Sequence, residues 1–275
     1  MPTVALPASP LAPGVSPVLI HYRDAGAGRP LVFLHGGWGY AIYPFDRQIA
    51  ALSRTHRIVI PDRSGYGQSG RLATQEVDFH QRAAEETFAL IEALGLRQPV
   101  LWGHSDGAVI ALLMGLAHPE RLSALILEAT HLHRSKPSSR GFFETMRDDP
   151  DGLGERVTSV LARDHGNAWR DLIRINGVAW LRIADERPAA DADLYAGRLA
   201  QLQLPTLIVH GARDPRTEPG ELDAIRAALP HAQVALLADA GHSPHSERLA
   251  ADEVTRAAEH FLAAIALPAE GAAPR

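Results

Sequence analysis

Short apolar runs alternate with longer amphipathic segments along most of this chain, and few folds accommodate such an alternation. Several of the runs are apolar on successive residues, which is typical of strands covered by helices on both faces. Strands separated by helical segments indicate a parallel sheet with crossover helices. The runs predicted as strands are residues 31–34, 57–60, 100–102, 124–127, 206–209 and 233–237.

The segments between these runs predict the helices that cover the sheet. In residues 78–95, apolar side chains recur at helical spacing and Gly95 provides a stop. Residues 18–23 alternate between apolar and polar side chains, so we expect an antiparallel edge strand there. The helices expected against the sheet are residues 78–95, 107–117, 219–229 and 246–265.

Residues 133–203 interrupt the strand–helix rhythm. They carry many charges and no buried strand pattern, and amphipathic helices are expected at residues 152–164, 167–183 and 191–200. We therefore expect a helical cap, inserted into a core of residues 18–132 and 204–267. Residues 1–17 are rich in proline and are expected to form a flexible arm, and residues 268–275 a frayed tail.

Composition excludes several classes of protein. The chain of 275 residues has 27 basic and 32 acidic side chains, a net charge of −5 and no dense basic tract, which argues against a nucleic-acid or anionic-membrane partner. It has no cysteine, so disulfides, thiolate metal sites and cysteine nucleophiles are excluded. No apolar run approaches the ~20 residues that cross a bilayer. We expect a soluble cytoplasmic protein, monomeric or homodimeric.

The segment Gly103-His104-Ser105-Asp106-Gly107 is the strongest catalytic signal. This G-x-S-x-G follows the predicted strand 100–102 and precedes the predicted helix 107–117. A sharp strand-to-helix turn exposes the serine oxygen at the carboxyl edge of the sheet, beside a helix N-terminus that favours negative charge. We therefore interpret Ser105 as a nucleophile.

A serine hydroxyl needs a base, and that base needs an orienting acid. Among 14 histidines, His242 lies in the loop after the last predicted strand. Asp214 follows the preceding strand in the same manner. The carboxyl ends of parallel strands meet at one edge, so Ser105, Asp214 and His242 are expected to converge as a triad.

These motifs resemble those of the α/β-hydrolase superfamily, in its serine esterase-like branch with a helical cap, over about residues 18–265. Ser64 stands where this motif of the family usually has another residue, and we expect the difference to affect the geometry of the loop rather than catalysis. The resemblance implies a mostly parallel eight-stranded sheet, an oxyanion hole formed by the backbone N–H groups of Gly37 and Asp106, and no cofactor or metal. The matching segments are residues 35–39, 62–69, 103–107, 210–214 and 241–242.

Three side chains are candidate substrate contacts. Trp38 lies within the oxyanion segment and is the favoured aromatic wall. The Asp106 carboxylate could bind a substrate ammonium, or it could cap the following helix. Glu128 ends the strand 124–127, where some members of the superfamily place the triad acid, although Asp214 is preferred. The sequence His131-Leu132-His133 could ligate a metal, but no carboxylate pattern accompanies it.

The sequence thus predicts a serine hydrolase acting on a small carboxylic ester, with amides or lactones as related substrates. Two alternatives keep the same triad: hydrolysis of a carbon–carbon bond and cofactor-free perhydrolysis. A third alternative, from another class, is a ligand-binding receptor with weak turnover. A serine at position 105 disfavours epoxide hydrolysis and dehalogenation, because relatives with those activities use an aspartate nucleophile.

Overall fold

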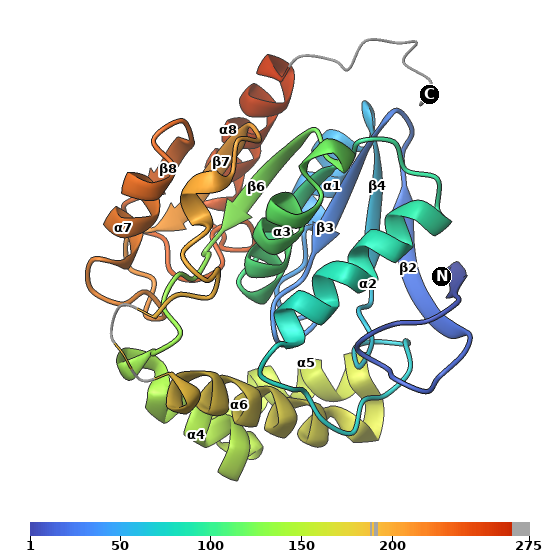
Figure 1. The fold of residues 1–275 in the computed structure, drawn as a ribbon, viewed down its shortest axis with the longest axis vertical. Coiled ribbons are helices and arrows are strands. Elements are labelled where there is room, and N and C mark those ends of the chain that lie inside the picture. Colours follow the sequence, from blue (N-terminus) through green and yellow to red (C-terminus); the bar gives the residue numbers. More distant parts are fainter. Residues whose placement is uncertain (188, 190–191, 266–275) are drawn as a thin grey trace.

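The computed structural model describes residues 1–187, 189 and 192–265, and an eight-stranded sheet forms its centre (Figure 1). The strands lie in the order β1-β2-β4-β3-β5-β6-β7-β8. From β4 to β8 the neighbours are parallel, whereas β1 and β2 are antiparallel to theirs. The predicted fold class is confirmed. The strands are β1 (Thr3–Leu6), β2 (Val18–Ala25), β3 (Arg29–Leu34), β4 (His56–Pro61), β5 (Val100–His104), β6 (Ala124–Glu128), β7 (Thr206–Gly211) and β8 (Gln233–Leu237).

Helices cover both faces of this sheet. Successive strand residues point to opposite faces. In β3, Val32 and Leu34 pack in the core that contains α2 and α3, whereas Leu31 and Phe33 pack in the core that contains α1 and α8. Burial on both faces explains the continuous apolar runs. The helices are α1 (Asp46–Leu52), α2 (Phe79–Ala93), α3 (Asp106–Ala117), α4 (Arg140–Asp148), α5 (Glu155–His165), α6 (Trp169–Glu186), α7 (Glu221–Ala228) and α8 (Ala251–Ala264).

The N-terminal segment differs from the expected loose arm. Thr3–Leu6 forms β1 and pairs with β2, so β2 is not the edge strand that we predicted. Leu6 is fully buried, and the Ser9 hydroxyl donates a hydrogen bond to Glu86 on α2. A four-residue strand is too short to show a clear alternation of apolar and polar side chains, and the nearby prolines favoured the prediction of a loose arm instead.

The helices α4, α5 and α6 lie between β6 and β7 in the chain and form a cap at the carboxyl end of the sheet (Figure 1). The predicted helices at 152–164 and 167–183 correspond to α5 and α6. The predicted helix at 191–200 is wrong for its described residues, because the Asp193 carboxylate accepts hydrogen bonds from the N–H groups of Tyr195 and Gly197 and holds a turn instead.

Other boundaries also differ from expectation. Helix α4 carries the buried Phe143 and Met146 against α6 and was not predicted, and neither was the seven-residue α1. Helix α8 begins at Ala251 rather than at residue 246. The expected tail at residues 268–275 lies outside the described residues. Within the described ranges, no helix is long and apolar enough to cross a membrane.

Candidate active site

Ser105 stands in a sharp turn between β5 and α3. Its backbone has φ of 55° and ψ of −122°, a conformation that a serine adopts only under strain. A Cβ atom at Gly103 would overlap the carbonyl group of Gly107, and one at Gly107 would overlap that of Leu34. The two glycines of the G-x-S-x-G segment are therefore a steric requirement of this turn.

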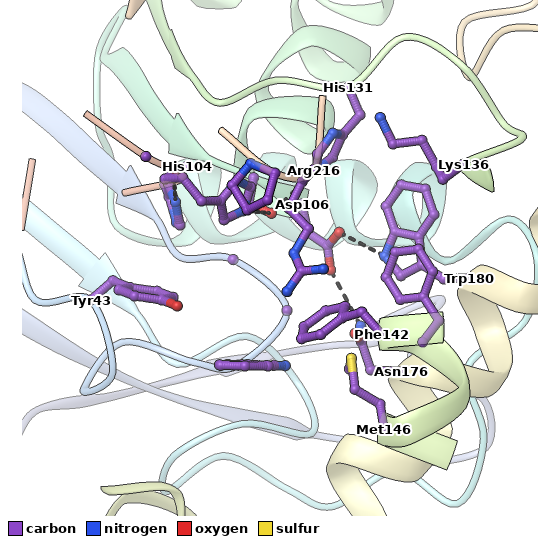
Figure 2. Close-up of a pocket in the computed structure, with 18 residues that line it drawn as sticks. Tyr43, His104, Asp106, His131, Lys136, Phe142, Met146, Asn176, Trp180 and Arg216 are labelled. Carbon is purple, nitrogen blue, oxygen red and sulfur yellow. Dashed lines mark hydrogen bonds between the residues drawn. The ribbon is translucent and has the colours of Figure 1, made fainter. Parts of the chain in front are cut away.

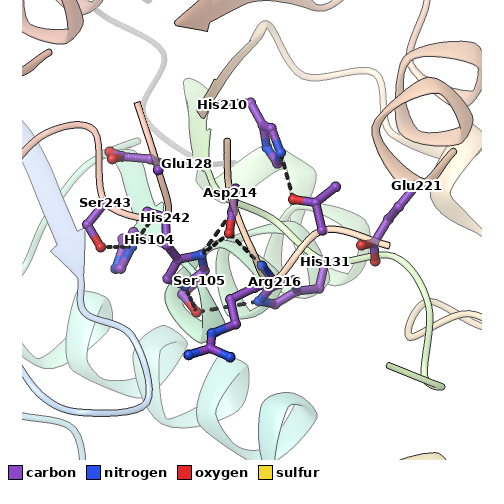
Figure 3. A network of polar contacts seen from close by, with 12 residues as sticks. His104, Ser105, Glu128, His131, His210, Asp214, Arg216, Glu221, His242 and Ser243 are labelled. Carbon is purple, nitrogen blue, oxygen red and sulfur yellow. Dashed lines mark hydrogen bonds and ion pairs between the residues drawn. The ribbon is translucent and has the colours of Figure 1, made fainter. Parts of the chain in front are cut away.

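The side chains of Ser105, His242 and Asp214 form one hydrogen-bonded chain (Figure 3). The Ser105 Oγ lies 3.1 Å from Nε2 of His242. Nδ1 of His242 lies 2.9 Å from both carboxylate oxygens of Asp214. An ionised carboxylate only accepts hydrogen bonds, so Nδ1 carries the proton and Nε2 accepts from the serine hydroxyl. The three residues follow β5, β8 and β7, respectively.

Asp214 is ionised in this arrangement. Burial opposes the charged form, but the hydrogen bond from His242 and that from the backbone N–H of Arg216 outweigh it and lower the pKa of Asp214 to about 2. The carboxylate thus carries a full negative charge beside the imidazole at neutral pH. A carboxylate in this position favours the imidazolium form of a neighbouring histidine.

Ser105 borders a cavity of about 350 Å³ between the sheet and the cap, and Figure 2 shows the residues that line this cavity. This volume lies at the lower end of the range for small-molecule sites. Gly37, Asp106 and the predicted wall residue Trp38 all border it. The aromatic part of the wall consists of Trp38, Tyr43, Phe142, Phe143 and Trp180, of which the last three come from the cap.

The Asp106 side chain joins the nucleophile turn to the cap. Its Oδ1 accepts hydrogen bonds from His80 Nε2 at 3.2 Å and Trp180 Nε1 at 3.1 Å, and its Oδ2 accepts one from Asn176 Nδ2 at 3.3 Å. The side chain is 2% exposed. Of the two roles weighed from the sequence, neither helix capping nor ammonium binding matches these contacts, because the carboxylate already has three donors from α2 and α6.

Glu128 does not border the cavity, so its prediction as a substrate contact is wrong. Its Oε1 accepts hydrogen bonds from the backbone N–H and Nδ1 of His245, and its Oε2 accepts one from Trp102 Nε1. Glu128 and Trp102 lie on the face of the sheet that α1 and α8 cover. The side chain is fully buried there, away from the nucleophile.

Four polar residues at the cavity were missed as site residues by sequence reasoning: His131, Lys136, Asn176 and Arg216. His131 Nε2 lies 3.5 Å from Ser105 Oγ, and its ring stacks on that of His242. Burial lowers the pKa of His131 well below the ordinary value, so this imidazole is neutral at pH 7. The one available signal was the position of His131 just after a predicted strand.

Lys136 and Glu221 form a buried ion pair beside the cavity. Burial lowers the pKa of Lys136, and the attraction of Glu221 opposes that shift. Glu221 also accepts hydrogen bonds from the N–H groups of Leu132 and His133. The pair therefore fixes the segment that leads from β6 into the cap. Nothing in the sequence linked position 136 to position 221.

A family model described as the alpha/beta hydrolase fold matches residues 29–183 and 151–249. The chain belongs to the α/β-hydrolase family. A thermophilic esterase from Thermogutta terrifontis superimposes on this α/β-hydrolase with a TM-score of 0.75 at 22% identity, over 96% of this chain and 99% of that one. A resemblance at this level of identity shows the fold.

Two curated relatives of this α/β-hydrolase are named as hydrolases. A pimeloyl-[acyl-carrier protein] methyl ester esterase from Nitrosomonas europaea is 29% identical, over 82% of this chain and 93% of that protein. A 2-hydroxymuconate semialdehyde hydrolase from Pseudomonas putida is 28% identical, over 88% of this chain and 89% of that protein. Both relatives are hydrolases, which supports a hydrolase activity here.

Proposed function

We propose that this α/β-hydrolase is a serine hydrolase that cleaves small carboxylic esters through an acyl-enzyme, with amides or lactones as related substrates. The observation that carries the proposal is the hydrogen-bonded chain from Ser105 through His242 to Asp214 at the floor of a cavity. An esterase among the relatives supports the same reaction class.

In the proposed reaction, the Ser105 oxygen attacks the ester carbonyl while His242 Nε2 accepts the hydroxyl proton. The imidazolium then gives this proton to the leaving alcohol, and the acyl group remains on Ser105. Water attacks the acyl-enzyme with His242 again acting as base, which releases the acid and restores the serine. Asp214 keeps the proton on Nδ1 and stabilises the imidazolium throughout.

The tetrahedral intermediate carries an oxyanion, and we assign its donors to the backbone N–H groups of Gly37 and Asp106. Both residues border the cavity beside Ser105. The Asp106 amide also belongs to the first turn of α3, where backbone N–H groups favour negative charge. Loss of one such donor typically costs about 3 kcal/mol of transition-state stabilisation.

Hydrolysis of a carbon–carbon bond is the second candidate, because a relative with 28% identity is named as a 2-hydroxymuconate semialdehyde hydrolase. The same nucleophile and base would serve it. The two candidates differ in their preferred substrates: the ester hydrolase acts on simple neutral esters, whereas the second candidate acts on a dienoic diketone-type substrate.

Labelling with a fluorophosphonate and turnover of 4-nitrophenyl esters from acetate to octanoate test the proposal. We expect labelling and turnover of the shorter esters by the wild type, and loss of both in Ser105→Ala. Ser159→Ala is the matched control, because Ser159 is exposed on α5 and should leave both intact. Labelling without ester turnover would favour the carbon–carbon hydrolase, and absence of both would favour a ligand-binding receptor.

A further inference from the structure

The guanidinium of Arg216 is a cation at the cavity that the proposed reaction does not use. Arg216 lies two residues after the triad acid and borders the cavity (Figure 2). Its Cζ lies over the ring of Phe142, 3.1 Å from the ring centroid. Phe142 belongs to α4, so the guanidinium reaches from the core loop to the cap.

The other charges that border the cavity already have partners. The Asp106 carboxylate accepts three hydrogen bonds, and Lys136 is paired with Glu221. Both oxygens of Asp214 face His242. Among the residues that the structure describes, no carboxylate lies within ion-pair distance of the Arg216 guanidinium. Within the described part of the chain, Arg216 is therefore the charged side chain at this cavity that has neither a hydrogen-bond partner nor an ion-pair partner.

The geometry of the stacked Arg216 guanidinium indicates which chemical group of a ligand it would bind. The face that lies on Phe142 is occupied, whereas the N–H groups lie in the plane of the guanidinium and form a fork. A carboxylate accepts such a fork through two parallel hydrogen bonds. Burial lowers the pKa of Arg216, which reflects the cost of holding an unpaired charge there, yet a guanidinium remains protonated at neutral pH.

We propose that Arg216 selects esters that carry a free carboxylate, which its guanidinium binds while Ser105 attacks the ester group. This inference rests on the proposed function and narrows its substrate class to anionic monoesters. Arg216 is a specificity-determining residue in this role, because it binds a part of the substrate away from the reacting carbonyl.

Isosteric esters test the proposal directly. Monomethyl glutarate and 4-acetoxybutyrate are isomers that place the carboxylate on the acyl and alcohol sides, respectively. Methyl 4-carbamoylbutanoate and 4-acetoxybutanamide replace the carboxylate of the first and the second isomer, respectively, with a neutral amide, and methyl 5-aminopentanoate supplies a cation. We expect kcat/KM for at least one carboxylate isomer to exceed that of the corresponding amide by about tenfold or more.

Variants of Arg216 test whether this side chain causes the preference for carboxylate esters. Arg216→Met is expected to bring the carboxylate-to-amide ratio of kcat/KM close to one, and Arg216→Lys to retain part of it, because an ammonium keeps the charge without the fork. Arg213→Met is the matched control, since Arg213 lies in the same loop, is exposed and pairs with Asp239. We expect the wild-type ratio in that variant.

A binding measurement separates this proposal from the proposed function. In Ser105→Ala, calorimetry with the preferred carboxylate ester should give at least tenfold tighter binding than with an isosteric amide, and Arg216→Met on that background should remove the difference. Equal binding of the two, or a preference for the cationic ester in the wild type, would overturn the role of Arg216. Absence of turnover with selective binding intact would overturn the esterase reaction alone.

Discussion

Two buried carboxylates, Asp214 and Glu128, follow or end neighbouring strands, yet only Asp214 reaches the imidazole of His242. We expect Asp214→Asn to lower kcat by about 10³–10⁴-fold, because an amide no longer fixes the tautomer of the imidazole. Glu128→Gln should lower kcat less than tenfold and should instead lower the melting temperature, since it weakens the contacts to His245 and Trp102. Ester kinetics and thermal unfolding of both variants measure the contrast, and the reverse pattern would reassign the triad acid.

Two histidines contact the Ser105 hydroxyl, and they should contribute unequally. His242 Nε2 lies at 3.1 Å, whereas His131 Nε2 lies at 3.5 Å, the limit for a hydrogen bond. We expect His242→Gln to lower kcat at least 10³-fold and His131→Gln to lower it less than tenfold. Steady-state rates with a neutral ester at pH 8 provide the measurement. Equal losses would mean that His131 takes part in proton transfer.

At the level of residues, the sequence allowed Ser105, Asp214 and His242 to be brought together because each follows a strand whose direction the pattern predicts. The surroundings of Asp106 and Arg216 could not be derived in the same way. Their partners, Trp180 and Phe142, come from the cap, and the packing of cap helices depends on crossing angles that hydrophobic periodicity does not encode.

At the level of elements, the Asp106 carboxylate connects α3 to α6 of the cap. Asn176→Leu keeps the branching of the side chain but removes the donor to Asp106 Oδ2, so we expect a loss of about 1–3 kcal/mol in the free energy of unfolding. Urea denaturation measures the loss. Asn167→Leu, at an exposed position of the same cap, should change stability by less than about 0.5 kcal/mol. Similar values for the two variants would contradict a role for the network.

Elements with long periodic patterns were the ones that could be predicted. Helices α2, α3, α5, α6 and α7 lie within a few residues of their expected bounds. By contrast, α1 and α4 are short, and β1 has four residues and depends on hydrogen bonds to β2. The stability of such short elements comes from tertiary contacts rather than from a local pattern.

At the level of the whole molecule, buried histidines make stability depend on pH. Burial lowers the pKa of His104 to about 3 and those of His35 and His131 well below the ordinary 6.5. Between pH 6.5 and about 3 the unfolded chain therefore binds more protons than the folded one, so stability falls as pH falls. Each fully shifted group contributes a slope of up to about 1.4 kcal/mol per pH unit.

We accordingly expect the free energy of unfolding in urea to be nearly constant from pH 8 to 7.5 and to decrease from pH 6.5 to pH 5. The pKa of Asp214 is lowered to about 2, so protonation of this carboxylate reduces the free energy of unfolding further only below about pH 4. His104→Gln should reduce the slope between pH 6.5 and 5, because one shifted group is removed. A free energy that does not change between pH 7.5 and 5 would contradict this account.

The contact between Asp106 and the cap bears on how such enzymes diversify. The side chains that we propose as nucleophile, base and acid all lie on the core. Exchanging residues 133–203 for a foreign insertion would therefore preserve these groups while replacing much of the cavity wall. A transplanted segment, however, must supply hydrogen-bond donors equivalent to Asn176 and Trp180. In chimeras that lack these donors, the buried Asp106 carboxylate beside Ser105 would lose hydrogen bonds, which is costly for a buried charge. This requirement restricts which cap segments recombination can introduce.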